Sequence, residues 1–291
     1  MTYTPSTPTS PAFLLSSPRA SAEDAPLAVA VAVADVRSEP NDGSELVTQA
    51  LLGVAAQHVA EVNGWVRVHL PDYEGWMRSQ DLAQPAEAAD KVAVVTALQT
   101  PIFLDAAGEN LYDTAYVTTA LPVLESTSTS GCVCVALPGS ACGWIDATSV
   151  AIHAATQPFP RGTVEDVLAL ARQMLGVPYL WGGATPRATD CSGLVQICWR
   201  HAGITLRRDA NQQYESITNV VARGELRAGD LAFFARDGRI VHVGLMLDGK
   251  RILHADGTTR HQVTINGLTP ESEDYRPRLD ALYAGARRPL P

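Results

Sequence analysis

The sequence has little positive charge, no long apolar run and few cysteines. It holds 22 lysine and arginine residues against 31 aspartate and glutamate residues, and its net charge is −9. Because nucleic acid and anionic lipid bind clustered basic side chains, this balance argues against both as partners. The Ala/Val-rich run at residues 27–34 is shorter than a membrane span and lies between Asp24 and Asp35. We therefore predict no nucleic-acid partner and no membrane partner.

The N-terminal residues also lack the features of a secretory signal. The stretch "MTYTPSTPTSPAFLLSSPRA" has no basic segment at its start, and its apolar run from Ala12 to Leu15 is short. We therefore expect a cytoplasmic protein, and export through an atypical signal is the alternative.

The five cysteines, at positions 132, 134, 142, 191 and 198, are an odd number in a chain too long to need a disulfide framework. Cys132, Cys134 and Cys142 have no second pair at metal-ligand spacing, so we predict no metal site. Most of the cysteines are expected to be structural.

The charge that is present divides the chain in two. Residues 1–159 hold 5 basic and 17 acidic residues, a net −12, whereas residues 160–291 hold 17 basic and 14 acidic residues, a net +3. A domain boundary near Pro158–Pro160 follows. Residues 1–26 are rich in proline, serine and threonine and are predicted to form a flexible arm.

Between the arm and this boundary the sequence shows short β-branched runs separated by turn signals. A weak internal repeat is present, because "GWMRSQDL" at 75–82 returns as "GWIDATSV" at 143–150. We predict two small all-β barrels, at residues 27–87 and 88–155.

After the boundary the apolar period becomes helical. "TVEDVLALARQMLG" has a capping-box-like start at Thr163 and Asp166 and a terminating glycine at Gly176. "CSGLVQICWRHAG" predicts a second helix that begins at Cys191, and strand patterns follow from residue 225. Residues 156–291 are therefore predicted to form an α+β domain.

Cys191 combines two properties that suit a nucleophile. The N-terminus of a helix has free N–H groups and the positive end of the dipole, which favour a thiolate and can hold an oxyanion. The alternative is a small buried residue, but the flanking "GGATPRATDCSG" is polar and rich in turns. Cys198, on the apolar face of the same helix, fits that alternative better.

His242 and His254 lie on neighbouring predicted strands and are candidates for the base and the group that orients it. A lone histidine on an apolar strand is more often a core residue. If Asp248-Gly249 alone formed the loop, the two rings would lie on opposite faces of the sheet. The catalytic hypothesis therefore requires an odd-numbered loop or a bulge.

Taken in order, "PYLWGG", "TDCSGLV", "RAGDLAFF", "HVGLML" and "ILHAD" resemble the NlpC-type cell-wall peptidases, which are papain-like cysteine hydrolases. The resemblance spans residues 160–288. It implies that Cys191 is the nucleophile, His242 the general base and His254 the orienting residue. It also implies that Tyr179 and the Cys191 N–H hold the oxyanion, although Tyr179 and Trp181 could equally be core aromatics.

The resemblance further implies hydrolysis of the amide between γ-D-glutamate and a diamino acid in murein peptides, without metal or cofactor. The first half of the chain resembles paired bacterial SH3-like domains. In the muropeptide-recycling subfamily the first of these closes the substrate site, and the substrate is a peptide with a free L-Ala amino group.

That subfamily binds the substrate ammonium with a barrel acid, a barrel tyrosine and the aspartate before the nucleophile. Tyr73 and Asp190 match the last two. The pattern expects an acid where this sequence has Val47, and Glu45 lies two positions upstream. Glu45 could substitute from a shifted position, or it could be a solvated surface acid.

The remaining candidates concern the substrate carboxylate. Ser192 adjoins the nucleophile and Arg208 could bind a carboxylate through two hydrogen bonds, so both are predicted to contact the D-glutamate, and Trp181 is a further predicted substrate contact. Ala210 occupies a position where the subfamily is expected to have a hydroxyl.

Four functional hypotheses remain open: a recycling endopeptidase, an exported wall-lytic endopeptidase or amidase, a binding protein whose barrels carry the function, and an acyltransferase on the same scaffold. A murein peptide is the predicted partner of the first. The sequence does not determine the oligomeric state.

Overall fold

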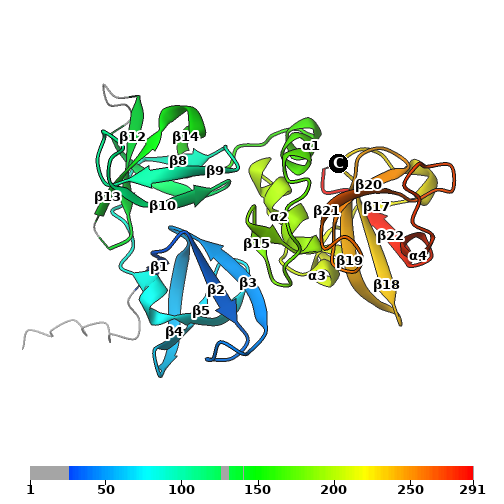
Figure 1. Cartoon of the computed structure of the whole chain (residues 1–291), viewed down its shortest axis with the longest axis horizontal. Helices are drawn as coiled ribbons and strands as arrows, with labels where there is room; N and C mark the ends of the chain where they lie inside the picture. Colours follow the sequence, from blue (N-terminus) through cyan, green and yellow to red (C-terminus); the bar gives the residue numbers. More distant parts are fainter. Residues whose placement is uncertain (1–25, 126–130, 140, 291) are drawn as a thin grey trace, which may run out of the picture.

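A computed structural model of the chain describes residues 26–125, 131–139 and 141–290. The predicted flexible arm lies outside the described residues, except for Pro26, which begins the first strand. Two seven-stranded sheets lie at one end of the molecule, three helices in the middle and a six-stranded sheet at the other end (Figure 1). This order confirms the predicted fold class of two small all-β SH3-like barrels followed by an α+β domain.

The first barrel curls around its own apolar cluster, in which Val29, Val68 and Met77 are fully buried. The run "WVRVHL" supplies Trp65, Val66, Val68 and Leu70 as predicted, and all four are buried. Its strands pair in the order β3-β2-β6-β5-β4-β1-β7. They are β1 (Pro26–Val29), β2 (Val33–Arg37), β3 (Leu46–Leu51), β4 (Ala55–Val62), β5 (Trp65–His69), β6 (Glu74–Arg78) and β7 (Leu82–Ala83).

The second barrel repeats the first strand for strand, because its order is β10-β9-β13-β12-β11-β8-β14. Its strands are β8 (Lys91–Val95), β9 (Gln99–Phe103), β10 (Leu111–Tyr116), β11 (Ala120–Glu125), β12 (Cys132–Leu137), β13 (Ala141–Asp146) and β14 (Val150–Ala154). The structure therefore confirms the repeat seen in the sequence.

The repeated Gly-Trp pair has a packing reason. Gly75 lies in β6 and Gly143 in the equivalent strand β13. A Cβ at Gly75 would come within 2.6 Å of Val36 Cγ1, and one at Gly143 within 2.6 Å of Ile102 Cγ2. In each barrel, a residue without a side chain is what allows the neighbouring strand to pack this closely.

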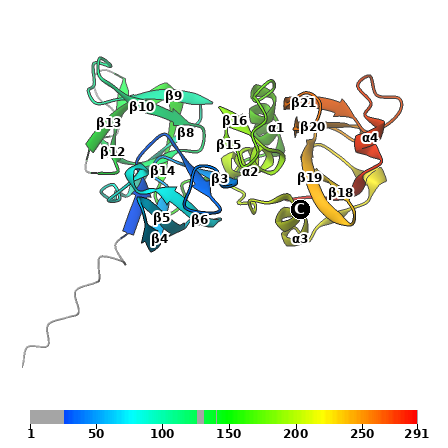
Figure 2. The same ribbon diagram turned by 60° about the horizontal axis from the view of Figure 1, so that its bottom comes forward.

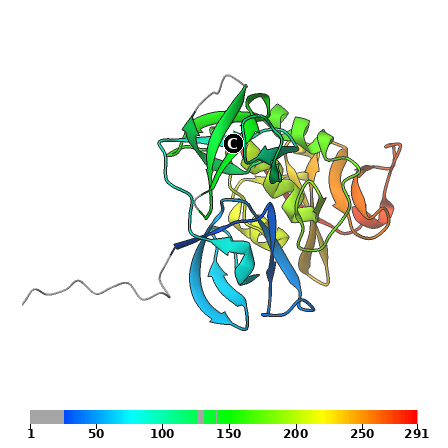
Figure 3. The ribbon, with the colours of Figure 1, turned by 60° about the vertical axis from the view of Figure 1, so that its left-hand side comes forward.

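The two barrels contact each other and the helices (Figures 2 and 3). The Ala32 N–H donates to Asp113 Oδ2 at 2.9 Å, and the Tyr112 hydroxyl donates to the Ala30 carbonyl. Val117, in the turn after β10, is buried in the same apolar cluster as the helices. The second barrel is thus packed against both the first barrel and the C-terminal domain.

The C-terminal domain has an antiparallel sheet with the order β17-β22-β18-β19-β20-β21. Its first three helices lie on the barrel side of this sheet, and the fourth lies on the far side (Figure 1). Its helices are α1 (Val164–Gln173), α2 (Cys191–His201), α3 (Ala210–Ser216) and α4 (Pro277–Asp280). Its strands are β15 (Ala184–Thr185), β16 (Ala188–Thr189), β17 (Val220–Val221), β18 (Leu231–Arg236), β19 (Arg239–Met246), β20 (Arg251–Asp256), β21 (Gln262–Gly267) and β22 (Tyr283–Arg287).

The local signals for the first two helices are confirmed. Thr163 and Asp166 form the capping box at the start of α1, and Asp190 caps α2. α1 ends at Gln173, before Gly176, which has the left-handed φ of 84°. Cys198 is fully buried between α2 and the sheet, as the sequence predicted for a structural cysteine.

We expect the variant Gly75→Ala to lower the free energy of unfolding by about 1–3 kcal/mol, because the added methyl group overpacks β6 against Val36. Urea denaturation followed by tryptophan fluorescence measures the change. Gly224→Ala is the control, since no atom lies within 4 Å of a Cβ at Gly224. Equal effects of the two substitutions would contradict the packing argument.

Candidate active site

Cys191 is the first residue of α2, directly after the capping residue Asp190. An Asp190 carboxylate oxygen accepts the Gly193 N–H at 2.7 Å, which fixes the start of the helix. The thiol is 8% exposed, and the N–H groups of Ser192 and Val243 lie beside its sulfur. The nucleophile therefore lies against β19, next to the strand residue that follows His242.

His242 and His254 lie on the same face of the sheet. Leu245 pairs with Leu253 and the Leu247 N–H donates to the Arg251 carbonyl, so the loop between β19 and β20 has three residues, 248–250. This odd-numbered loop meets the condition that the catalytic hypothesis set. His242 Nε2 lies 2.9 Å from His254 Nδ1.

Asn266 extends this pair into a chain of three side chains. Its Oδ1 lies 2.9 Å from His254 Nε2, and its Nδ2 donates to the Asp274 carbonyl. The carbonyl fixes the amide orientation, so His254 must carry its proton on Nε2 and accept through Nδ1. His242 then carries its proton on Nε2 and has a free lone pair on Nδ1. The chain prepares His242 to take the thiol proton.

Burial sets the resting charge of the pair. Desolvation raises the pKa of Cys191 to about 12, with a contribution from the Asp190 charge, although the Val243 and Ser192 N–H groups lower it. Desolvation also lowers the pKa of His242 to about 3. The expectation that the helix N-terminus alone would favour a thiolate omitted this burial. In the resting site the Cys191 thiol and the His242 imidazole are therefore both neutral.

Gly244 makes room for the histidine pair. It directly precedes Leu245, which pairs with Leu253 in the register of β19 and β20. A Cβ at this position would lie 2.8 Å from His254 Cβ and 2.5 Å from Ile252 Cδ1. A side chain here would move His254 away from His242, so the absence of one positions the orienting residue.

Tyr179 and Trp181 lie on the segment that precedes the nucleophile. Burial raises the pKa of Tyr179, and the nearby Cys191 and Asp190 charges raise it further, so its hydroxyl stays protonated as a donor. The Tyr179 ring also lies where a side chain at Gly257 would be. Trp181 is 62% exposed and, like Tyr179, lines the cavity beside the two histidines. Trp181 is too exposed to be a core aromatic, whereas Tyr179 is half-buried and packs against the core cluster of the C-terminal domain.

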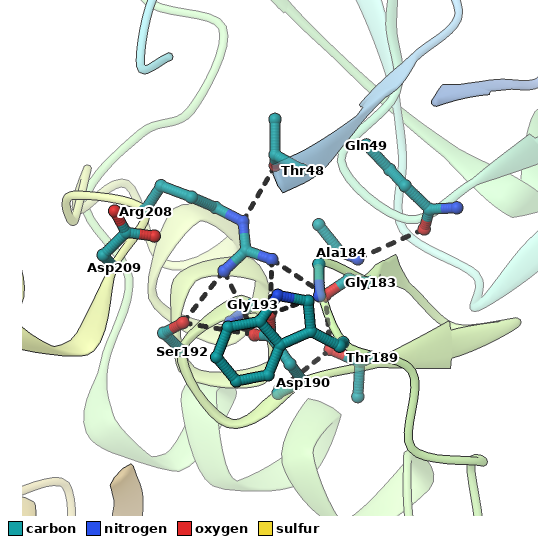
Figure 4. Close-up of polar contacts among 12 residues, drawn as sticks. Thr48, Gln49, Gly183, Ala184, Thr189, Asp190, Ser192, Gly193, Arg208 and Asp209 are labelled. Carbon is teal, nitrogen blue, oxygen red and sulfur yellow. Dashed lines mark hydrogen bonds and ion pairs between the residues drawn. The ribbon is translucent and has the colours of Figure 1, made fainter. Parts of the chain in front are cut away.

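Arg208 joins the nucleophile's helix to the first barrel (Figure 4). Its side chain is 1% exposed and forms an ion pair with Asp190 at 2.6 Å. It also donates to the Ser192 hydroxyl, to the Gly183 carbonyl and, at 2.8 Å, to Thr48 Oγ1 of β3. Removing any one partner would leave a buried charge or donor unsatisfied.

These contacts correct the predicted roles of Arg208 and Ser192. The guanidinium makes five hydrogen bonds to protein acceptors, so it has no donor left for a substrate carboxylate. Ser192 is 5% exposed, and its hydroxyl donates a hydrogen bond to Asp190 and accepts one from Arg208. Both residues position Asp190 and the start of α2.

The first barrel contributes further side chains at this boundary. Glu45 Oε1 accepts the Trp181 Nε1–H at 2.8 Å, and the Tyr73 hydroxyl donates to Asp209 Oδ2 at 3.3 Å. The barrel backbone at Leu46 lies where a side chain at Gly182 would be. Glu45, two residues before the expected acid position, is an exposed residue that contacts Trp181 of the peptidase domain.

Val47, at the expected acid position, packs partly buried against the core of the first barrel. The upstream shift to Glu45 is thus consistent with the packing of β3.

Among the described residues, no group of three or more His, Cys, Asp or Glu side chains is placed to hold a metal ion. No helix of the described segments has the length and apolar character needed to cross a membrane.

Sequence reasoning missed Asn266, Gly244, Asp209 and Thr48. Asn266 is 12 residues from the histidine that it contacts, and Thr48 is 160 residues from Arg208. Only Asn266 had a local signal, because the strand pattern "HQVTI" places it on the strand that follows His254.

We predict that both histidines carry their proton on Nε2. Long-range proton–nitrogen NMR spectra of the imidazole rings distinguish the two tautomers directly. Asn266→Ala removes the acceptor, so we expect both tautomers of His254 to be populated. Asn266→Asp keeps an acceptor, so we expect His254 to remain protonated on Nε2. Asn219→Ala changes an exposed asparagine and serves as the control. A His254 ring protonated on Nδ1 in the unmodified protein would refute the proposed arrangement of protons along Asn266, His254 and His242.

A second prediction concerns the thiol. Because burial raises the pKa of Cys191, the alkylation rate with iodoacetamide is expected to rise about tenfold per pH unit between pH 7 and pH 9. Peptide mapping by mass spectrometry isolates the rate at Cys191 from those of the other cysteines. A rate that is already constant from pH 6 would instead indicate a preformed thiolate–imidazolium pair.

Comparison with known proteins places the C-terminal domain in a peptidase family. Residues 176–276 match the NlpC/P60 family, and residues 36–82 match the bacterial dipeptidyl-peptidase Sh3 domain. A gamma-D-glutamyl-L-lysine dipeptidyl-peptidase of Bacillus cereus is 28% identical over 266 residues, which are 86% of this chain and 77% of that protein. The protein of the same name from Bacillus subtilis is 29% identical over 247 residues, 81% of this chain and 79% of that protein.

A crystal structure of an NlpC/P60 family protein from Bacillus cereus has the same fold over the whole length. It matches with a TM-score of 0.81 at 23% identity and covers 92% of this chain and 100% of its own. The Cys191 and histidine geometry lies within the matched family segment. Residues 176–276 therefore form an NlpC/P60 cysteine peptidase domain, which follows a bacterial dipeptidyl-peptidase Sh3 domain at residues 36–82.

Proposed function

We propose that the protein hydrolyses the amide bond between γ-D-glutamate and a diamino acid in murein peptides whose L-Ala amino group is free. The observation that carries the proposal is a group of acids at the boundary of the first barrel and the peptidase domain. Glu45 and Tyr73 come from the barrel and Asp209 from the peptidase domain, whereas both oxygens of Asp190 are hydrogen-bonded within the protein, so Asp190 contributes its charge and not a free oxygen. Relatives named gamma-D-glutamyl-L-lysine dipeptidyl-peptidases support the same bond.

The electrostatics of this boundary favour a bound cation. Desolvation raises the pKa of Asp209, the charges of Asp190 and Glu45 raise it further, and Arg208 opposes them. Desolvation and Asp209 raise the pKa of Tyr73 to about 12, and Glu45 adds to the shift. A substrate ammonium would relieve the repulsion among these acids, whereas a neutral acetyl group would not.

The geometry supports a two-step hydrolysis. Cys191 Sγ attacks the γ-carbonyl carbon as its proton passes to His242 Nδ1. The carbonyl oxygen gains charge beside the Cys191 N–H and the Tyr179 hydroxyl. The imidazolium then gives the proton to the leaving amine, the C–N bond breaks, and a thioester remains. Water, deprotonated by His242, attacks the thioester carbon. The C–S bond then breaks, the sulfur takes the proton back from His242, and the glutamate γ-carboxylate product leaves.

We further propose that the protein acts in the cytoplasm on released peptides. Its net charge of −9 favours small soluble fragments over an anionic wall. Fractionation of the producing cells, with immunodetection in each fraction, tests the location, and recovery from the culture medium or the wall would overturn it.

The substrate test compares L-Ala-γ-D-Glu-diaminopimelate with its N-acetylated form by mass spectrometry of the products. We expect acetylation to lower kcat/KM about 10- to 100-fold, since the ammonium loses charge-assisted hydrogen bonds. Cys191→Ala is expected to abolish both reactions. Equal cleavage of the two peptides would show that the free amine is not recognised.

Variants of the barrel acids test which residue binds the substrate ammonium. Glu45→Gln is expected to lower kcat/KM for the free-amine peptide and to leave the acetylated peptide unchanged. Glu61→Gln, on an exposed strand of the same barrel, is the matched control. If Glu45→Gln and Glu61→Gln behaved alike, Glu45 would be a surface acid without a role in binding.

A further inference from the structure

The two catalytic histidines form one wall of a cavity of about 810 Å³. The cavity extends from Tyr179 and Trp181, past His242, to the segment around α4. Its lining includes none of Glu45, Tyr73, Asp190 and Asp209. Trp181, which lines the cavity, is hydrogen-bonded to Glu45, so one end of the cavity lies beside the first barrel and the other lies near α4.

This position assigns the end near α4 to the leaving group. His242 protonates the leaving amine, so the amine and the rest of its residue must lie on the histidine side of the scissile bond. The acyl part, which ends in the proposed ammonium, lies on the barrel side. The diamino acid thus occupies the end of the cavity near α4.

The charged side chains that line the cavity are three arginines and one aspartate: Arg236, Arg276, Arg278 and Asp256. Asp256 is 3% exposed and accepts hydrogen bonds from the Thr258, Thr259 and Arg260 N–H groups and from Arg276. These donors hold its pKa at about 2 although burial opposes them. Asp256 is therefore occupied and offers no free oxygen to a substrate ammonium.

Arg236 and Arg278 differ from Arg276. Both are exposed, and neither forms an ion pair with any residue in the described part of the chain, whereas Arg276 is paired with Asp256. The lining of the same cavity also includes the apolar side chains of Leu279, Leu282 and Val241. Val241 is the extra residue at the bulge opposite Phe234 and Ala235, and it is 47% exposed.

We propose that this cavity selects a diamino acid whose side chain ends in a carboxylate, as diaminopimelate does, over one that ends in a bare ammonium, as lysine does. The apolar side chains of the lining pack against the side-chain methylenes, and Arg236 and Arg278 bind the terminal carboxylate. A lysine ammonium would meet two unpaired guanidinium groups and no free acid. The inference rests on the proposed function and specifies its leaving group.

The test compares L-Ala-γ-D-Glu-diaminopimelate with L-Ala-γ-D-Glu-L-Lys. The two tripeptides have the same length and the same main-chain carboxylate, so they differ only at the end of the diamino acid side chain. We expect kcat/KM to be at least about tenfold higher for the diaminopimelate peptide, as a charge-assisted hydrogen bond supplies.

The double variant Arg236→Gln/Arg278→Gln is expected to lower this ratio toward one by slowing cleavage of the diaminopimelate peptide alone. Arg239→Gln, an exposed arginine of β19 outside the cavity lining, is the control and is expected to keep the ratio.

Equal cleavage of both peptides by the unmodified protein, or a ratio that the double variant leaves unchanged, would overturn the inference and leave the proposed function intact. Cleavage of neither peptide would overturn the proposed function, and the inference with it.

Discussion

The buried ion pair of Arg208 and Asp190 is the constraint on which the rest of the site depends. A guanidinium that is 1% exposed is stable only if every donor has a partner. Its partners come from the first barrel, from the segment before α2 and from the first turn of α2. The same aspartate caps the helix that presents Cys191. The position of Cys191 is therefore coupled to the docking of the barrel.

A second constraint acts on the base. The chain from the Asp274 carbonyl through Asn266 and His254 to His242 has one consistent arrangement of protons. It requires a three-residue loop between β19 and β20 and a glycine at 244. Burial keeps the thiol and the imidazole neutral, so this arrangement, rather than a standing charge on the sulfur, prepares the proton transfer.

The two ends of the site differ in charge. The barrel end gathers Glu45, Asp190 and Asp209 around Tyr73, and the end near α4 carries Arg236 and Arg278. A substrate with an ammonium at its acyl end and a carboxylate at its leaving end is complementary to both. Under the proposed function, the two ends set the direction in which a short peptide binds and so place one amide bond at Cys191.

The sequence by itself determined the succession of domains, the capped helices and the order Cys191, His242 and His254. Each of these depends on neighbours within a few residues, so helix caps, turn signals and strand periodicity are enough to predict them. Only the tertiary structure decided that Arg208 is a buried positioning residue, that Glu45 reaches Trp181 past Val47, and that Asn266 completes the histidine chain. Those contacts join residues from 12 to 160 positions apart. No local pattern records such a distance, because packing and not spacing brings the side chains together.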